Sequence, residues 1–223
     1  MFLIVSGGNP PGIDLLHRKS READVIIAAD RGAHYCLEAG IYPHLLVGDM
    51  DSLSRHELKE IADRGIEIRS FPTAKDKTDT QIALEEAIRR HATSIEIVAA
   101  TGGRFDHALA NVHLLVRALQ TGIPARIVDN RQEIFLLAGE SVLEGKRGMT
   151  ISLLPLTRTV KRVSLEGFAY ELSDAEMHIG NPYGVSNIIT SEKACVSIGE
   201  GIIVAVLMTE DVSSGAPVGG ERD

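Results

Sequence analysis

The sequence predicts two domains of different class: a Rossmann-like α/β domain on a parallel sheet, followed by an all-β domain that forms an antiparallel β-sandwich. Up to about residue 129, short β-branched apolar runs alternate with segments of helical period, which is typical of a parallel sheet covered on both faces. After residue 130, strand-like runs follow one another with Gly, Pro and Asn breaks and without a helical period, which indicates antiparallel strands.

The candidate strands of the first domain are short, continuous apolar runs, as expected for strands buried on both faces. They cover residues 2–5, 24–29, 44–47, 66–69, 95–100 and 125–128. Segments of helical period lie between them. In the segment 54–64, Ser54 and Glu57 have the spacing of a capping box and Gly65 marks the end, so we expect a helix there. We expect this α/β domain to span residues 1–130.

The second domain contains a series of strand candidates separated by turn residues, which is the pattern of a sandwich or a barrel. They cover residues 133–138, 149–154, 160–165, 168–172, 186–190, 193–198 and 201–208. We expect the β-sandwich domain to span residues 131–210. Residues 211–223 are rich in Ser, Gly and Pro, which predicts a disordered tail.

Composition and charge argue against several classes of protein. The formal net charge of −8 argues against a nucleic-acid-binding surface, and it means that an anionic substrate needs a metal or a few basic side chains to offset its charge. Cys36 and Cys195 lack a C-x-x-C spacing, so we expect buried, reduced thiols. No apolar run nears the length of a membrane span, so we expect a cytoplasmic protein that does not bind membranes.

Polar clusters follow five of the predicted parallel strands, at the point where each strand ends. They lie at residues 6–9, 30–32, 48–51, 75–79 and 101–104. Any one of them could be an ordinary turn. Because ligands of open parallel sheets bind outside the carboxyl ends of the strands, five clusters at one edge predict a functional site there.

Asp49 and Asp51 are the strongest candidates for metal ligands. They stand two residues apart in a segment expected to be extended, where alternate side chains point the same way and can share one cation. Hard carboxylate oxygens in open positions suit Mg²⁺, which is usually held by one or two carboxylates together with substrate phosphates. The alternative is a turn in which the aspartates make local backbone hydrogen bonds, and for an isolated D-x-D pair the two interpretations have about equal weight.

Residues 78–81 have the pattern of a capping box, which places Asp79 in the first turn of a helix. The helix start is electropositive, so the Asp79 carboxylate stays ionised and can bind a metal. Lys75 and Lys77 precede the helix and can face phosphate oxygens. The alternative is that Asp79 only complements the helix dipole and the lysines are solvated, and for this cluster alone the alternative is favoured.

Residues 101–107 join a strand to a helix that we expect to begin with Asp106 as N-cap and to end at Gly122. Gly102 and Gly103 allow the backbone to approach a ligand closely, and Arg104 can offer a bidentate fork to phosphate. The segment matches neither a Walker A motif nor a G-x-G-x-x-G fingerprint, so by itself it is a weak signal.

Five motifs, in their order and spacing, resemble the thiamine pyrophosphokinase family, and the resemblance extends to about residue 208. They are ADRGA at 29–33, GDMDS at 48–52, DKTD at 76–79, GGRFDH at 102–107 and GVSN at 184–187, the last by itself a plain turn and strand. The family transfers a pyrophosphoryl group from ATP to the hydroxyethyl group of thiamine, giving thiamine diphosphate and AMP. The resemblance implies this activity, an α/β domain followed by a β-sandwich, and a homodimer with its site between subunits.

The resemblance also implies a role for each matching residue. Mg²⁺ ligands are implied at Asp49, Asp51 and Asp79, and catalytic roles at Asp76, Asp79, Arg104 and Asp106. Contacts to ATP or thiamine are implied or suggested at Asp30, Lys75, Lys77, Thr78, Gly102, Gly103, Ser186 and Asn187, the last two from the β-sandwich of the partner subunit. A carboxylate such as Asp76 or Asp106 can accept the hydroxyl proton or pair with the aminopyrimidine, and the sequence does not choose between these roles.

The chain departs from the family at one position that matters for the substrate. Some members stack the thiamine ring on a tryptophan, and this chain contains none. Tyr183 or another aromatic side chain is the candidate cation–π platform for the thiazolium ring.

Two other functions are compatible with parts of the pattern. An aspartyl-nucleophile phosphatase also uses a D-x-D motif at a strand end, but such enzymes place it after the first strand and need no all-β second domain. A non-catalytic nucleotide- or thiamine-binding regulator on the same fold is the other alternative. The intact acidic set argues against this second possibility.

Overall fold

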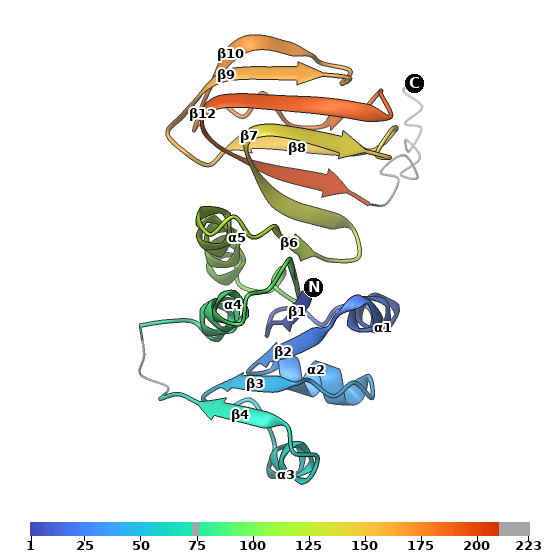
Figure 1. Cartoon of the computed structure of the whole chain (residues 1–223), viewed down its shortest axis with the longest axis vertical. Coiled ribbons are helices and arrows are strands. Elements are labelled where there is room, and N and C mark those ends of the chain that lie inside the picture. The colour runs from blue at the N-terminus through green and yellow to red at the C-terminus, as the bar shows by residue number, and fades with distance from the viewer. Residues whose placement is uncertain (73–75, 210–223) are drawn as a thin grey trace, which may run out of the picture. The chain divides into compact units, whose positions relative to one another are not determined.

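The computed structural model describes residues 1–72 and 76–209 and divides the chain into two compact units, which are shown in Figure 1. Unit 1 comprises Met1–Asn130 with Ile134–Leu136, and unit 2 comprises Arg131–Glu133 with the chain from Leu137 onward. Unit 1 is α/β and unit 2 is all-β, which confirms the predicted fold class. The segment 211–223, for which a disordered tail is predicted, lies outside the described residues.

Within the described residues, unit 1 is built on six parallel strands. The buried strand β1 (Phe2–Val5) pairs with β2 (Val25–Ala29) on one side and with β5 (Ile95–Val98) on the other. The others are β3 (Leu45–Gly48), β4 (Glu67–Ser70) and β6 (Ala125–Val128), and the order across the sheet is β6-β5-β1-β2-β3-β4. All six strands predicted for the first domain are present.

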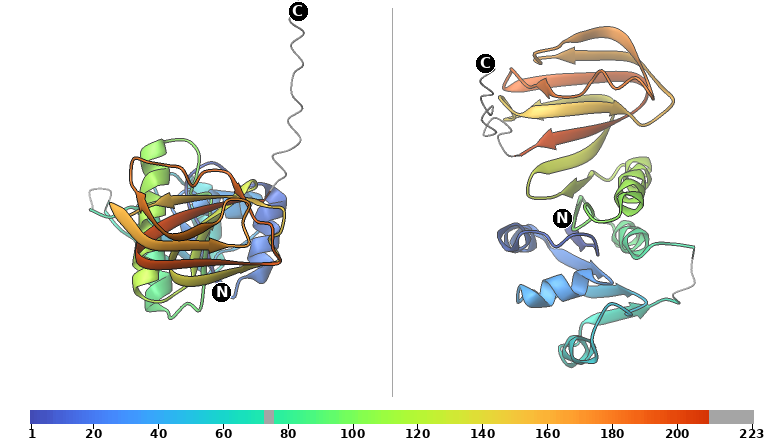
Figure 2. Two further views of the ribbon diagram at one scale, coloured as in Figure 1. Left: turned by 90° about the horizontal axis from the view of Figure 1, so that it is seen from above. Right: turned by 180° about the vertical axis from the view of Figure 1, so that it is seen from behind.

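Helices cover both faces of this sheet, as Figures 1 and 2 show. One face carries α1 (Ile13–Glu22), α2 (Gly32–Glu38) and α3 (Arg55–Asp63), and the other carries α4 (Asp79–Arg89) and α5 (Phe105–Gln120). Leu16, Cys36 and Ile61 bring α1, α2 and α3 into one apolar cluster with β1, β2 and β3. Among the described residues, no helix is long and apolar enough to cross a membrane.

The helix starts follow from local capping, with two corrections. Ser54 and Glu57 form the predicted capping box at α3. Of the capping box predicted at α4 only one half forms, because the Thr78 side chain accepts the backbone N–H of Gln81 while the Gln81 side chain donates to Glu85. The prediction of Asp106 as the N-cap of α5 is wrong, because Arg104 is the last extended residue and Asp106 lies in the first helical turn. Asp106 instead accepts hydrogen bonds from the Arg104 side chain and from the His107 backbone N–H.

The strand order places a topological switch point beside β1. The chain adds β2, β3 and β4 on one side of β1, and then crosses to add β5 and β6 on the other side. The loops that follow β1 and β5 therefore leave neighbouring strands in opposite directions, which opens a crevice at the carboxyl edge of the sheet.

Unit 2 is built from antiparallel strands: β7 (Gln132–Glu144, of which Ile134–Leu136 group with unit 1), β8 (Thr150–Pro155), β9 (Thr159–Glu166), β10 (Leu172–His178), β11 (Asn187–Ile188) and β12 (Lys193–Met208). One run of pairings has the order β10-β9-β12-β7, and β8 pairs with β11 and β12. Alternate residues point inward, so that Val163 and Leu165 of β9 pack with Val196 and Ile198 of β12 in the buried core.

β12 is one continuous strand, whereas the sequence predicts two strands at 193–198 and 201–208. It pairs with β9 through residues 195–200 and with β8 through residues 203–207. Gly201 lies between the two paired regions with φ of +100°, and a Cβ at this position would lie 2.7 Å from Thr157 Oγ1. Glycine therefore allows the strand to bend from one partner to the other rather than ending it.

Three further predictions for the second domain are wrong, two in the bounds of a strand and one in the burial of a side chain. The strand expected at 168–172 is β10, which lies later and has a positive φ of +49° at Asp174 and shifts in register, so the apolar alternation is broken. Of the strand expected at 186–190, only β11 forms. Cys195 is exposed rather than buried, because its neighbours Ala194 and Val196 on β12 take the inward positions.

A buried carboxylate, Glu86 of α4, connects α4 to β4. It is 7 % exposed and accepts hydrogen bonds from Arg69 of β4 at 2.8 Å, from Arg89 at 2.5 Å and from Arg90 at 2.6 Å. The Arg89 hydrogen bond is the largest of the interactions that lower the pKa of Glu86 to about 2. The ionised form is thus strongly favoured in the folded protein.

We predict that Glu86→Gln lowers the free energy of unfolding by about 2 kcal/mol at pH 7, because the charge that holds three guanidinium groups is lost. The folded-state pKa of Glu86 is lowered, so its stabilisation is present above the ordinary value of 4.5 and is lost as pH falls towards about 2. Urea unfolding of the wild type and of Glu86→Gln at pH 7 and at pH 3 measures the difference in the free energy of unfolding. Glu67→Gln is the matched control, because Glu67 also binds Arg69 and Arg90 but is exposed. Equal unfolding midpoints at pH 7 would contradict the prediction.

Candidate active site

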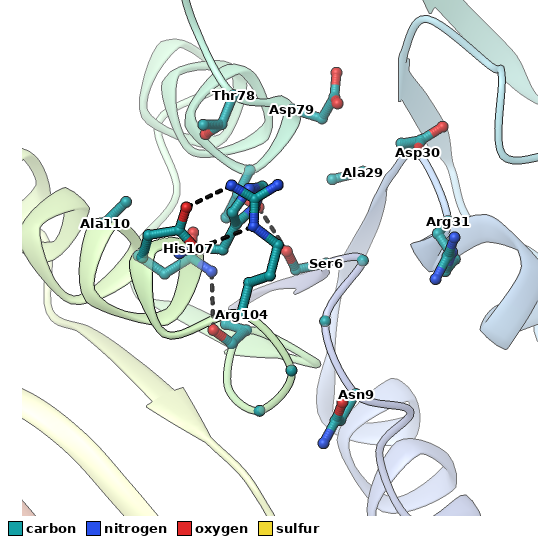
Figure 3. Close-up of a pocket in the computed structure, with 18 of the residues that line it drawn as sticks. Ser6, Asn9, Ala29, Asp30, Arg31, Thr78, Asp79, Arg104, His107 and Ala110 are labelled. Atoms are coloured by element: carbon teal, nitrogen blue, oxygen red, sulfur yellow. Dashed lines mark hydrogen bonds and ion pairs between the residues drawn. The ribbon is translucent and has the colours of Figure 1, made fainter.

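A pocket of about 740 Å³ lies at the switch point of unit 1, at the carboxyl edge of the sheet. Figure 3 shows Asp30 and Asp79 on one side of it, His107 and Ala110 of α5 on the other, and the Arg104 side chain between them. The lining consists of residues 6–9 after β1, 29–31 after β2, Ser52 after β3, 78–80 at the start of α4, and Ala100, Gly102, Gly103, Arg104, Asp106, His107, Ala110 and Asn111 after β5.

Three carboxylates converge beside this pocket. Asp30, Asp49 and Asp51 each offer a ligand atom, and these atoms all lie within 4.8 Å of one another. The segment that contains Asp49 and Asp51 is a turn rather than the extended stretch expected, because Met50 has φ of +65°. Asp51 N–H donates to Asp49 Oδ1 at 3.3 Å, which is the local backbone hydrogen bond of the turn alternative. The same two aspartates also converge with Asp30, so the two alternatives do not exclude each other.

Asp30 has the most unusual environment of the three. Its backbone has φ of +46°, a conformation that costs energy for a residue with a side chain. Its Oδ2 accepts a hydrogen bond from Ser52 at 2.5 Å, while its Oδ1 is buried without a hydrogen-bond partner among the described residues. A buried carboxylate oxygen without a donor is unfavourable, so a bound cation would satisfy it.

Asp79 and Thr78 lie at the start of α4 and line the pocket, as expected for residues at an electropositive helix start. Asp79 is not part of the group formed by Asp30, Asp49 and Asp51. Its role as a metal ligand stays a prediction. The next residue, Thr80, is buried and shares a hydrogen bond of 2.5 Å with Ser6, which fastens α4 to the loop after β1.

Gly102, Gly103, Arg104 and Asp106 line the opposite side of the pocket. The Arg104 fork is bidentate on Asp106, with Nε 3.1 Å from Oδ1 and Nη2 2.5 Å from Oδ2. This pairing lowers the pKa of Asp106 and raises the pKa of Arg104. Both side chains are mostly exposed, so an incoming anion can compete with Asp106 for the guanidinium group.

Of the predicted site residues before Thr78, Asp76 and Lys77 do not line the pocket. Asp76 is exposed and does not line it. Lys77 donates to Glu85 at 2.7 Å, so its ammonium group lies along α4 instead of facing the pocket. Lys75 lies outside the described residues.

The predicted thiamine contacts lie in unit 2. Ser186 is exposed, with φ of +59°, and its N–H donates to Ser152 Oγ at 3.1 Å. Asn187 is only 5 % exposed, and its amide group is engaged with Tyr170: Nδ2 donates to the Tyr170 carbonyl at 2.8 Å, and Oδ1 accepts the Tyr170 N–H at 3.0 Å. Asn187 therefore holds the loop that carries Tyr170.

Several pocket residues are absent from the predicted site set. Ser6 and Asn9 belong to a strand-end cluster visible in the sequence, but nothing local assigns them a role. Asn111 is a buried polar residue on the inner side of α5, and its Nδ2 donates to the Ala100 carbonyl at 2.8 Å. Its position four residues before Leu115 and three after Ala108, among apolar positions of one helical face, is the signal that could have identified it.

Two family models match the two parts of the chain. Residues 16–127 match the model described as "Thiamin pyrophosphokinase, catalytic domain", and residues 141–203 match the model described as "Thiamin pyrophosphokinase, vitamin B1 binding domain". The first match covers the pocket side chains from Asp30 to Asn111, and the second covers Tyr170, Ser186 and Asn187.

Similar proteins and structures agree with these models. The chain is 30 % identical to the thiamine pyrophosphokinase of Bacillus subtilis over 209 residues, which covers 93 % of this chain and 98 % of that protein. The crystal structure of the Bacillus subtilis protein superimposes with a TM-score of 0.83 at 29 % identity, covering 94 % of this chain and 99 % of the other. The thiamin pyrophosphokinase of Geobacillus thermodenitrificans has a TM-score of 0.82 at 30 % identity, covering 95 % and 99 %.

We predict that Gly102→Ala destabilises the protein more than Gly122→Ala. Both glycines have a positive φ, +79° and +74°, so each substitution introduces a similar backbone strain of about 1 kcal/mol. Only at Gly102 would the new Cβ meet another residue, at 2.2 Å from Asn9 Nδ2, whereas no atom lies within 4 Å at Gly122. Urea unfolding of the two variants measures the difference, and equal loss of stability would show that the loop of Asn9 yields without cost.

Proposed function

The chain belongs to the thiamin pyrophosphokinase family, and we propose that it transfers a pyrophosphoryl group from ATP to the hydroxyl group of thiamine, giving thiamine diphosphate and AMP. The observation that carries the proposal is the sheet edge of unit 1, where the pocket with its glycine loops and Arg104 lies beside a group of three carboxylates, one of which, Asp30, lines it. This combination suits a polyphosphate with its metal ion.

We propose Mg²⁺ as the metal, held by Asp30, Asp49 and Asp51. The three ligand atoms are hard oxygens within 4.8 Å of one another, and the buried Oδ1 of Asp30 has no partner among the described residues, so the donor set fits a small divalent cation. When bound, Mg²⁺ neutralises negative charge on the phosphate oxygens. The predicted ligands are Asp49, Asp51 and Asp79, and this assignment adds Asp30, while Asp79 is not part of the group of three carboxylates.

In the transfer, the hydroxyl oxygen of thiamine forms a bond to the β-phosphorus of ATP, and the bond from that phosphorus to the oxygen it shares with the α-phosphorus breaks. AMP leaves with this oxygen, and the hydroxyl proton passes to a carboxylate. Since Asp106 lines the pocket and Asp76 does not, we propose Asp106 as the acceptor. A phosphate that displaces Asp106 from Arg104 removes the pairing that lowers the pKa of Asp106, so substrate binding makes this carboxylate more basic.

An aspartyl phosphatase is not favoured for this chain. The family to which the chain belongs supports pyrophosphoryl transfer instead. The structure adds that Asp49 accepts the N–H of Asp51 and belongs to the carboxylate group, which suits a metal ligand better than a nucleophile. A nucleophilic carboxylate needs an open line of attack on phosphorus.

We propose that thiamine binds unit 2 at Tyr170. Tyr170 is 73 % exposed, while its backbone is held on both sides by Asn187, so its ring is presented on a fixed loop. Tyr183 is less exposed, at 46 %, and its hydroxyl donates to the Glu176 carbonyl. An exposed, fixed aromatic face suits the cationic thiazolium ring, so we favour Tyr170 over Tyr183 as the cation–π platform.

We propose that the chain works as a homodimer in which the pocket of unit 1 acts together with the thiamine site of the partner subunit. Support comes from Phe105 and Leu109 of α5, apolar side chains that are 78 % and 41 % exposed next to Arg104 and Asp106. Such an exposed apolar surface is typical of an interface. Use of ATP and the two free cysteines favour the cytoplasm as the compartment.

The proposal predicts that the protein, given ATP, Mg²⁺ and thiamine, forms thiamine diphosphate and AMP in equal amounts and no ADP, as measured by chromatography. Asp51→Asn should lower kcat by roughly two orders of magnitude, because a lost metal ligand removes several kcal/mol of transition-state stabilisation. Its melting temperature should barely change. Formation of ADP or free phosphate would contradict the proposed reaction, and an active Asp51→Asn variant would contradict the metal site.

We predict that Tyr170→Ala raises the KM for thiamine about tenfold, which is the loss expected for one cation–π contact. Mixing Tyr170→Ala with Asp51→Asn should then restore activity, because mixed dimers contain one site with both halves intact. Random exchange limits the recovery to about a quarter of the wild-type rate at low thiamine. If labelled subunits exchange and the mixture shows only the average of the two variants, both halves of the site belong to the same chain.

A further inference from the structure

Tyr35 of α2 reaches the loop that lines the pocket after β1. Its hydroxyl donates to the carbonyl oxygen of Gly8 at 2.7 Å, across 27 residues of sequence. Gly8 lines the pocket, whereas Tyr35 does not. Tyr35 therefore contacts the pocket wall from behind and is separated from any ligand by the backbone of the glycine loop.

Gly8 is held from its other side by the loop that follows β5. Its N–H donates to the Ala99 carbonyl at 2.7 Å, and the next residue, Asn9, donates to the Thr101 carbonyl at 3.1 Å. A Cβ at Gly8 would lie 2.5 Å from Ala99 O and 2.8 Å from Thr101 O, so only glycine fits there. The hydrogen bond from Tyr35 thus holds the peptide plane between Gly8 and Asn9, whose N–H donates to the loop after β5.

The helix that presents Tyr35 is itself closely packed on β1. Gly32, at its start, is so near to β1 that a Cβ would lie 1.9 Å from the Val5 carbonyl oxygen. The two residues before α2 are Asp30 and Arg31, which line the pocket, and the Ala33 N–H donates to the Asp30 carbonyl. Tyr35 therefore joins the loop of the carboxylate Asp30 to the glycine loop, and Figure 3 shows these two loops at different parts of the pocket wall.

We propose that Tyr35 is a positioning residue for the nucleotide, through Gly8. This inference rests on the proposed function. Two consecutive glycines, Gly7 and Gly8, lose much conformational freedom when they are ordered, so a loop that is not held would have to be ordered by the ligand at the expense of affinity. The hydroxyl of Tyr35 orders the loop before ATP arrives. Thiamine, for which we propose a site in unit 2, is not affected by this hydrogen bond.

The experiment is Tyr35→Phe, which removes only the hydroxyl, with Tyr42→Phe as matched control. Tyr42 lies in the same unit, and its hydroxyl donates to Glu60 at 3.4 Å on the surface, outside the pocket lining. We expect Tyr35→Phe to raise the KM for ATP about fivefold, the effect of one neutral hydrogen bond, while kcat and the KM for thiamine change less than about twofold. Tyr42→Phe should match wild type. Calorimetric titration with Mg²⁺ and a non-hydrolysable ATP analogue should show the same weakening without turnover.

The outcomes separate this inference from the proposed function. An active wild-type enzyme with an unchanged KM for ATP in Tyr35→Phe overturns the role of Tyr35 and leaves the proposed function standing. A general effect, in which both KM values and kcat change together with a lowered melting temperature, shows that the hydroxyl serves only stability and also overturns it. A wild-type protein that forms no thiamine diphosphate and does not bind the ATP analogue overturns the proposed function and this inference together.

Discussion

The pairing of β1 with both β2 and β5 is the constraint on which the rest of unit 1 depends. β1 is buried along its whole length, and it lies where the chain reverses the direction in which strands are added to the sheet. The loops that follow β1 and β5 therefore diverge, and a pocket opens between them. Gly32 allows α2 to approach β1 closely, which brings the loop of Asp30 to the same edge.

The pocket concentrates negative charge in a protein that is already acidic. Asp30 has an unfavourable backbone conformation and a buried oxygen without a partner among the described residues, and its carboxylate lies close to those of Asp49 and Asp51. The backbone conformation costs stability with or without a ligand, whereas the unpartnered oxygen and the close carboxylates cost stability as long as no cation is bound. The structure accommodates them because Ser52 donates a hydrogen bond to Asp30 and because residue 48 is a glycine. A Cβ atom at Gly48 would lie only 3.1 Å from the Cβ atom of Asp30. The arrangement thus suits the cation that we propose for this site.

A common device recurs in both units: a polar side chain holds the backbone of a loop, and a neighbouring group is left available for ligands. Asn187 binds the Tyr170 backbone through both N–H and carbonyl, and the Tyr170 ring stays exposed. Tyr35 holds the carbonyl of Gly8 in a loop that lines the pocket. In each case the residue that orders the loop is distinct from the group proposed to meet the substrate, which keeps positioning and contact separate.

Local features of the sequence determined the parallel strands, the capping box of Ser54 and Glu57, and the polar strand ends, because burial on both faces and helix capping depend on residues close in the chain. Only the tertiary structure decided that Asp30 joins Asp49 and Asp51, that Lys77 turns to Glu85, and that β12 continues through Gly201. The first and third outcomes depend on partners far away in sequence. The second depends on which of several possible partners binds the Lys77 side chain. For Asp30 and for β12, spacing along one segment contains no information on the contact, since the packing of the strands brings the partners together.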